Sequence, residues 1–342
     1  MLGSLRYDNY YMQSLKEEIE KEMQENNVFI LGAGFSVGAG IPTMDSLLEK
    51  AMSVFKSECN GIYQRITEKV SAYYGIKEVD YQKINFSELC TFLDYLELIE
   101  FGGGERFSDY GSRERLALKY FLCKAISVST PEIIPDYYLN FVKNLKKHDV
   151  VLTFNWDLLL EKSLIKCGKK FAYCNFEDNH DVDVYLIKPH GSMNWSIEER
   201  KNEMLRWIPM NLQRGITKHE IYYTNDLIYK YPYQSTSFFK EINPFIVLPG
   251  FGKGFDVRRL SAFWYKLESV FCLSRNIFVI GLSVSEDDYF IKSFLKDNLD
   301  LINSNITIMN PDPEIEKRYN FIKNTNLSFL KEPFGMYSGL KI

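Results

Sequence analysis

Short, uninterrupted runs of hydrophobic residues alternate along the chain with longer stretches of helical periodicity. The runs cover residues 28–31, 149–153, 184–187, 245–248, 277–280 and 306–309. Runs of this length without polar alternation are typical of parallel strands that are buried on both faces. Helical patterns follow several of them, at residues 158–165, 260–273 and 289–295. The alternation predicts an α/β fold with a Rossmann-like, doubly wound parallel sheet.

The stretch between the first and second predicted strands has helical periodicity for about 100 residues. Leu47, Leu48, Ala51, Met52 and Phe55 share one helix face, and residues 88–99 and 116–126 repeat the pattern, with a weak strand signal only at 76–79. A further helix is expected over 12–23, and residues 196–243 are either surface loops or a small subdomain. We therefore expect residues 1–342 to form a single domain, with a helical insertion at about 45–147 after the first strand.

Charge and cysteine content narrow the class of protein. The chain has 41 basic and 45 acidic residues, a net charge of −4, which removes the general attraction to nucleic-acid phosphates. Its six cysteines form no C-x-x-C pair, which argues against a disulfide framework and a thiolate zinc site. The apolar stretch 28–42 is shorter than the ~20 residues of a membrane span, and the N-terminus lacks an apolar signal segment. We expect a cytoplasmic protein that has no bound metal ion and no membrane-spanning segment.

A glycine-rich motif, Gly32-Ala33-Gly34-Phe35-Ser36-Val37-Gly38, follows the first predicted strand. Glycines at this place let the backbone approach a pyrophosphate, so the motif indicates a dinucleotide site; the alternative is a tight turn without a ligand. The spacing G-x-G-x-x-x-G differs from the dehydrogenase motif G-x-G-x-x-G, and the ribose-binding acid expected ~20 residues later is missing. Hydride transfer is therefore disfavoured.

Polar residues also follow the next two predicted strands of the sheet. Asn155 and Asp157 stand at the carboxyl end of strand 149–153, where a ligand of an open parallel sheet binds. The alternative is that Asp157 caps the following helix and Asn155 turns the chain. His190 follows strand 184–187 in the motif Lys188-Pro189-His190-Gly191-Ser192. It is our candidate general base because an imidazole titrates near neutral pH, although a lone histidine is often structural.

The last two predicted strands end in similar motifs. After strand 277–280, Gly281 and Ser283 are placed to contact a phosphate, and Ser285 or Asp287 is expected to cap the next helix. Asn310 follows strand 306–309 and is placed to hydrogen-bond a ribose. Each of these motifs, taken alone, is compatible with a simple turn.

Together and in this order, the five motifs resemble those of the sirtuin (silent information regulator) family, over residues 28–45 and 149–312. GAGFSVGAGIP resembles the family's GAGxSxxxGIP, TFNWD its TQNxD, PHGS its HG, GLSV its GTS, and MNPD its strand-end Asn. The resemblance implies NAD lying across the sheet. By it, the site residues are Gly32, Ala33, Gly34 and Ser36 for pyrophosphate and ribose, Asn155 and Asp157 at the nicotinamide ribose, His190 as base, Gly281 and Ser283 at phosphate and ribose, and Asn310 on the adenosine side.

Two departures from the deacetylating sirtuins change the expected activity. Thr43, Met44 and Asp45 replace the Asp-Phe-Arg that follows GIP in deacetylases, and the four-cysteine zinc module is absent. With its helical insertion the chain is similar to sirtuin-like effectors of bacterial antiphage defence, which cleave NAD to nicotinamide and ADP-ribose. The resemblance therefore implies an NAD glycohydrolase with NAD as substrate; a protein deacylase and a non-catalytic NAD or ADP-ribose sensor are the alternatives.

The partners expected from this resemblance are other protein chains. Because the chain is nearly all effector domain, we expect it to assemble as a homo-oligomer through the helical insertion. A separately encoded partner such as a hexameric DNA-translocating ATPase would then recognise the phage, while no direct nucleic-acid binding is expected.

Overall fold

The computed structural model describes residues 26–100, 113–173, 181–196, 206–208, 221–223, 244–250, 253, 257, 260, 264, 267, 270–271, 274–285, 288–300 and 302–335. The helix expected over 12–23, and most of the helix expected over 260–273, fall outside the described residues.

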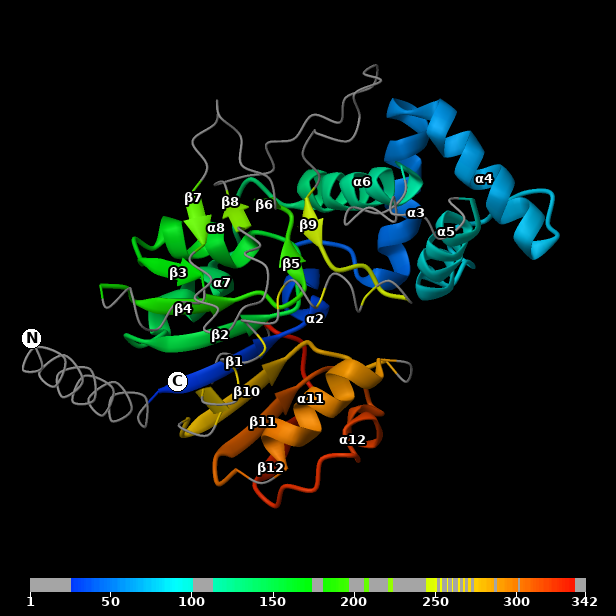
Figure 1. The fold of residues 1–342 in the computed structure, drawn as a ribbon. Helices are drawn as coiled ribbons and strands as arrows, with labels where there is room; N and C mark the ends of the chain where they lie inside the picture. Colours follow the sequence, from blue (N-terminus) through cyan, green and yellow to red (C-terminus); the bar gives the residue numbers. More distant parts are fainter. Residues whose placement is uncertain are drawn as a thin grey trace, which may run out of the picture.

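The described residues contain a seven-stranded parallel sheet in the order β12-β11-β10-β1-β2-β4-β3. Its strands are β1 (Asn27–Leu31), β2 (Asp149–Thr153), β3 (Phe171–Tyr173), β4 (Val184–Ile187), β10 (Asn276–Ile280), β11 (Asn305–Met309) and β12 (Leu327–Leu330). Strand β1 pairs with β2 on one side and with β10 on the other. The chain therefore winds outward in both directions from β1, which confirms the Rossmann-like, doubly wound sheet (Figure 1).

One predicted strand does not belong to this sheet. Within the run 245–248, β9 (Phe245–Ile246) pairs antiparallel with β5 (Gly191–Ser192), just after His190. Its apolar residues are as buried as those of the parallel strands, so hydrophobicity alone does not distinguish the two settings. The strand signal at 76–79 was also wrong, because the chain there forms a bend.

Short strands at the edges of the fold were not predicted. Strands β3 and β12 extend the parallel sheet at its two ends, and they are only partly buried. For residues 196–243 the sequence allowed either surface loops or a small subdomain. In and next to this region, a small antiparallel sheet is formed by β6 (Trp195–Ser196), β8 (Ile221–Tyr223) and β7 (Arg206–Ile208). The described parts of that region therefore favour a small subdomain.

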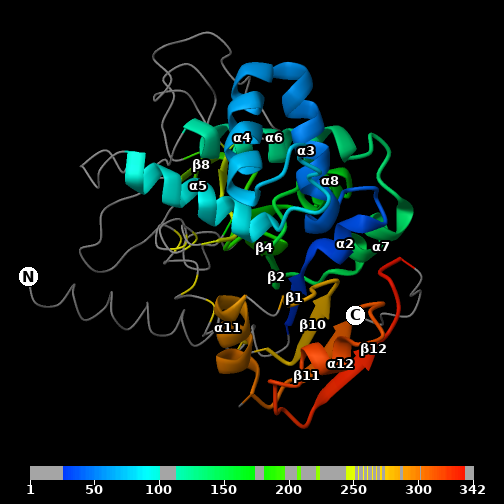
Figure 2. The same cartoon turned by 90° about the vertical axis from the view of Figure 1, so that its right-hand side faces the viewer.

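The helical insertion lies between β1 and β2, as predicted. It comprises α3 (Met44–Glu58), α4 (Asn60–Tyr74), α5 (Phe86–Glu100), α6 (Arg113–Ser129) and α7 (Asp136–Asn144). Helix α3 packs on α6, where the buried rings of Phe55 and Phe121 stack with their centroids 4.1 Å apart. Figure 2 looks onto the carboxyl ends of the strands and shows α3 to α6 gathered on that side of the molecule. The insertion therefore stands beside the edge where ligands of such sheets bind.

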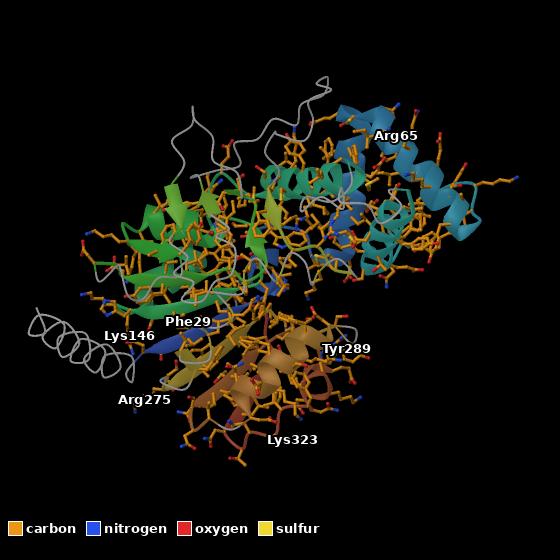
Figure 3. All side chains as sticks on the ribbon, in the orientation of Figure 1. Phe29, Arg65, Lys146, Arg275, Tyr289 and Lys323 are labelled. Atoms are coloured by element: carbon orange, nitrogen blue, oxygen red, sulfur yellow. The ribbon has the colours of Figure 1, made fainter. Side chains whose placement is uncertain are left out.

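Helices cover both faces of the sheet. The other described helices are α2 (Ala33–Val37), α8 (Leu159–Lys166), α11 (Tyr289–Leu299) and α12 (Ile315–Arg318). Phe29, labelled in Figure 3, packs on Phe141 of α7 at 5.3 Å and on Phe278 of β10 at 5.2 Å between ring centroids. Helix α11 lies on the opposite face of the sheet from α7 (Figures 1 and 2). The ring of its Phe294 packs on that of Phe271, with the centroids 5.6 Å apart. The continuous apolar runs of the sequence thus correspond to strands buried on both faces.

Candidate active site

Two glycine turns touch each other where β1 and β10 end. The amide of Gly32 donates to the carbonyl of Ile280 at 2.9 Å, and that of Gly34 donates to Gly281 at 2.8 Å. A Cβ added to Gly32 would lie 2.4 Å from the Cα of Leu282, and one added to Gly281 would lie 2.3 Å from the amide nitrogen of Phe35. Gly281 also has a φ of +63°, which disfavours other residues. These glycines therefore allow two backbone segments to meet where the winding of the sheet reverses, the usual ligand position.

Side chains of the first two motifs form a hydrogen-bonded chain beside these turns. Asn155 donates through Nδ2 to the carbonyl of Gly32 at 2.9 Å and to Oγ of Ser36 at 3.2 Å. Ser36 donates in turn to Oδ2 of Asp157 at 2.8 Å. The other oxygen of Asp157 accepts from the amide of Leu159 at 2.9 Å, at the start of α8. Asp157 thus makes the local helix contact as well as the long-range one, and the structure brings Gly32, Ser36, Asn155 and Asp157 together.

The last two motifs meet in a second cluster. The buried Asn310 donates through Nδ2 to Oγ of Ser283 at 3.1 Å and to the carbonyl of Leu282 at 3.3 Å. Its Oδ1 accepts from the amide of Asp312 at 3.0 Å. Because Gly281 and Ser283 both follow β10, this second cluster lies next to the glycine turns. Ala33, the remaining predicted site residue, is half-buried as the first residue of α2.

The cap of helix α11 differs from the prediction. We expected Ser285 or Asp287 to cap it, but the carboxylate of Asp288 accepts from the amide of Ile291 at 3.1 Å. The run of acidic residues made the position of the cap ambiguous in the sequence. Asp288 also forms an ion pair with Lys253, at 2.8 Å between Nζ and Oδ2.

His190 lies beyond the end of β4 in aromatic surroundings. Its ring centroid is 5.0 Å from that of Phe154 and 6.4 Å from that of Trp264. Its carbonyl accepts from the amide of Val247 at 2.8 Å, whereas its buried Nε2 has no hydrogen-bond partner among the described residues. Burial lowers the pKa of His190 to about 3; the Lys253 ammonium also lowers this pKa, and the Asp288 carboxylate opposes the shift.

This pKa differs from the near-neutral value that makes a histidine a good general base. An exposed imidazole titrates near pH 6.5, but burial keeps this one neutral throughout the physiological range. A neutral Nε2 or Nδ1 still offers one lone pair, so the residue can accept a hydrogen bond or a late proton. It is a weaker base than the sequence indicated.

Sequence reasoning missed a buried polar cluster under the site. Lys188, with 0% of its surface exposed, donates to the carbonyl of Asp157 at 2.7 Å and to Oε1 of Glu161 at 2.8 Å. The hydroxyl of Tyr173 donates to the same Oε1 at 3.0 Å, and burial raises the pKa of Tyr173 well above its usual value. The sequence does contain a signal for this cluster, because Lys188 directly follows four apolar residues of a predicted buried strand. A lysine at such a place is rarely buried without a partner, so a buried acidic or carbonyl partner was to be expected.

Neither a metal cluster nor a membrane helix is found in the part of the chain that the structure describes. No group of three or more His, Cys, Asp and Glu side chains in these residues is arranged to hold a metal ion. Within the same ranges, no helix is long and apolar enough to cross a bilayer.

Comparison with known proteins gives matches among solved structures. No protein-family model matches the chain, and no curated protein matches it. The chain is similar to the structure described as "The Structural basis of Sirtuin Substrate Affinity", with a TM-score of 0.39 and 15% identity over 90% of this chain and 89% of that chain. It is also similar to "Structure of Sir2Tm bound to a propionylated peptide", with a TM-score of 0.40 and 13% identity over 90% and 88% of the two chains. The strand order and registers given above, rather than these likenesses, define the doubly wound sheet.

Proposed function

We propose that this protein is an NAD glycohydrolase that cleaves NAD to nicotinamide and ADP-ribose in a sirtuin-like domain. The observation that carries the proposal is the hydrogen-bonded chain from Asn155 through Ser36 to Asp157, at the glycine turns between β1 and β10. It joins residues from two motifs that lie about 120 positions apart, at the edge where ligands of open α/β sheets bind. The proposed substrate is NAD, bound by Gly32, Ala33, Gly34, Ser36, Asp157, Gly281, Ser283 and Asn310.

The proposed reaction breaks the bond between nicotinamide and ribose and forms a bond from C1′ to water oxygen. Its transition state resembles an oxocarbenium ion, and nicotinamide leaves as a neutral molecule. The NH₂ group of Asn155 is engaged with Gly32 and Ser36, so its Oδ1 is the atom offered to a water molecule or ribose hydroxyl. His190 then takes the proton that water loses. A base with a low pKa is adequate here because an oxocarbenium ion is attacked by water that is still protonated.

Two alternatives belong to different classes of protein. A deacylase would need an acyl-lysine channel, and the positions of the deacetylase Asp-Phe-Arg are here Thr43, Met44 and Asp45, at the start of helix α3. A non-catalytic NAD or ADP-ribose sensor would need neither Asn155 nor His190. The presence of both residues favours catalysis.

The test is incubation of the purified protein with NAD alone, followed by chromatography. We expect equal amounts of nicotinamide and ADP-ribose. Release of nicotinamide only when an acylated peptide is added would identify a deacylase, and NAD binding without any release would identify a sensor.

The acid limb of the pH–rate profile is expected to lie below pH 5. With its pKa at about 3, His190 stays deprotonated between pH 8 and 5, so kcat/KM should be level there. A histidine with a pKa of ~6.5 would instead lose about 30-fold by pH 5. Lys253→Met removes a cation that lowers the pKa of His190 and releases the Asp288 carboxylate, so the limb should move to higher pH. An acid limb near pH 6.5 in the unaltered protein would contradict the assignment.

In the cell, the proposed role is a NAD-depleting effector of antiphage defence that works by abortive infection. The proposal includes a cytoplasmic location, a homo-oligomer built through the helical insertion, and a partner such as a hexameric DNA-translocating ATPase. Among the described aromatic side chains of the insertion, Tyr73 on α4 and Tyr95 on α5 are the most exposed, at 51% and 55%. Both side chains offer aromatic surface to a second copy.

Light scattering of the purified protein checks the oligomer. At micromolar concentration we expect a mass that is a multiple of 40.1 kDa, and Tyr95→Lys should shift it toward one chain because a lysine is poorly accommodated at a buried interface. A strict monomer that cleaves NAD at full rate would remove the oligomer and any regulation through it.

A further inference from the structure

We propose that Lys188 is a positioning residue that holds the two loops carrying Asn155 and His190 in a fixed relation; its kinetic consequence rests on the proposed function. Lys188 stands two residues before His190, and it reaches the carbonyl of Asp157, two residues after Asn155. One ammonium group therefore ties the loop after β4 to the loop after β2.

The contacts of Lys188 account for its complete burial. A buried ammonium is costly unless it is paired and hydrogen-bonded. Here the carboxylate of Glu161 on α8 supplies the opposite charge at 2.8 Å, and the Asp157 carbonyl supplies an acceptor at 2.7 Å. Because well-packed apolar residues often replace such pairs without loss of stability, stability by itself does not explain a lysine at this position. The position is explained by the need for a hydrogen-bond donor that reaches both α8 and the loop that carries Asn155.

A second link joins the same two loops on the other side of His190. The amide of Met193 donates to the carbonyl of Trp156 at 3.0 Å. His190 is therefore held between two cross-links, Lys188 upstream and Met193 downstream. Without the upstream link, the Asp157 carbonyl is released, and with it the Ser36 and Asn155 contacts that depend on the position of Asp157.

Kinetics of Lys188→Met give the first test. The methionine retains most of the apolar stem but has no donor. We expect kcat for NAD cleavage to fall by at least ~10-fold while KM changes by less than ~3-fold, because Asn155 and His190 lose their orientation while the binding contacts proposed for the glycine turns, Ser283 and Asn310 remain. The matched control is Lys124→Met, which removes a lysine–glutamate pair with Glu58 (2.6 Å) within the insertion. A kcat like that of the control would overturn the proposal.

Hydrogen–deuterium exchange of the unliganded protein gives a second test, which does not depend on NAD cleavage. In Lys188→Met, the amides of Leu159 and Met193 should exchange at least ~10-fold faster, because they report the Asp157 side chain and the downstream link. The exchange rates of these two amides should be unchanged in Lys124→Met. If the unaltered protein releases no nicotinamide but these two amides exchange faster in Lys188→Met, the proposed function fails and the positioning role stands. If their exchange in Lys188→Met equals that in the unaltered protein, the positioning role is overturned.

A second variant, which alters the carboxylate in place of the ammonium, covers the case in which Lys188→Met does not fold. Glu161→Gln keeps an oxygen acceptor for Lys188 and Tyr173 but removes the compensating charge. We expect the same two amides to exchange faster, by a smaller factor than in Lys188→Met, and kcat to fall with little change in KM. Exchange and kcat both equal to those of the unaltered protein would overturn the proposal.

Discussion

Asn155→Ala is expected to lower the rate of NAD cleavage by at least ~100-fold, and His190→Ala by a similar factor, the scale typical of losing a positioned catalytic group. Asn155 is held by its contacts to Gly32 and Ser36, so alanine removes the oriented Oδ1 together with these two contacts. The hydrogen bond from Ser36 to Asp157 still joins the two motifs. The measurement is kcat from nicotinamide release under saturating NAD.

The controls separate catalysis from folding. Asn320→Ala removes an exposed asparagine after α12 and should leave kcat unchanged. Both site variants should retain the circular dichroism spectrum of the unaltered protein. Turnover like that of the unaltered protein in either site variant would refute the role given to that residue.

Gly281→Ala is expected to destabilise the fold by about 2–5 kcal/mol, a large share of the ~5–15 kcal/mol typical of domains. Its Cβ would lie 2.3 Å from the amide nitrogen of Phe35 and 2.4 Å from the carbonyl carbon of Gly34, and backbone atoms cannot turn aside as a flexible side chain can. The left-handed φ of +63° adds strain. Urea unfolding measures the loss, and NAD affinity should fall with it because the two glycine turns must separate.

Gly168→Ala separates strain from close approach. Gly168 has a similar φ of +71°, but a Cβ there would meet nothing within 4 Å. It should therefore cost only the left-handed strain of about 1–2 kcal/mol. If Gly281→Ala cost no more than Gly168→Ala, the contact between the glycine turns would not be the reason for the glycine.

Local sequence was sufficient for the strands of the sheet centre and for the placing of the motifs. Strands β1, β2 and β4 are buried at every residue, and β10 and β11 are buried at Ile277, Val279, Ile280, Ile306, Ile308 and Met309. The apolar runs that fill these buried positions are visible in the sequence. Because parallel strands share one direction, the residues that follow them fall at one edge of the sheet. That is why Asn155 and Asp157 were predicted to lie near one ligand, and the family resemblance added Ser36 to them. In the structure Ser36 contacts both Asn155 and Asp157.

Other features depended on partners that lie far away in the sequence. The apolar run at 245–248 joined β5 instead of the main sheet, because pairing is decided by which strand edge is adjacent, and apolar burial is the same in both cases. The pKa of His190 follows from burial and from Lys253 and Asp288, at positions more than 60 residues away. The role of Lys188 follows from a carbonyl and a carboxylate 31 and 27 positions away.

The sequence by itself determined the fold class, the helical insertion and the polar residues at the strand ends, because each of these follows from short-range periodicity and from strand direction. The tertiary structure alone decided which of those residues touch, which groups are desolvated, and which buried charge ties the loops together. Hydrogen-bond partners and solvent exclusion are properties of packed surfaces, and these surfaces come from segments that are distant along the chain.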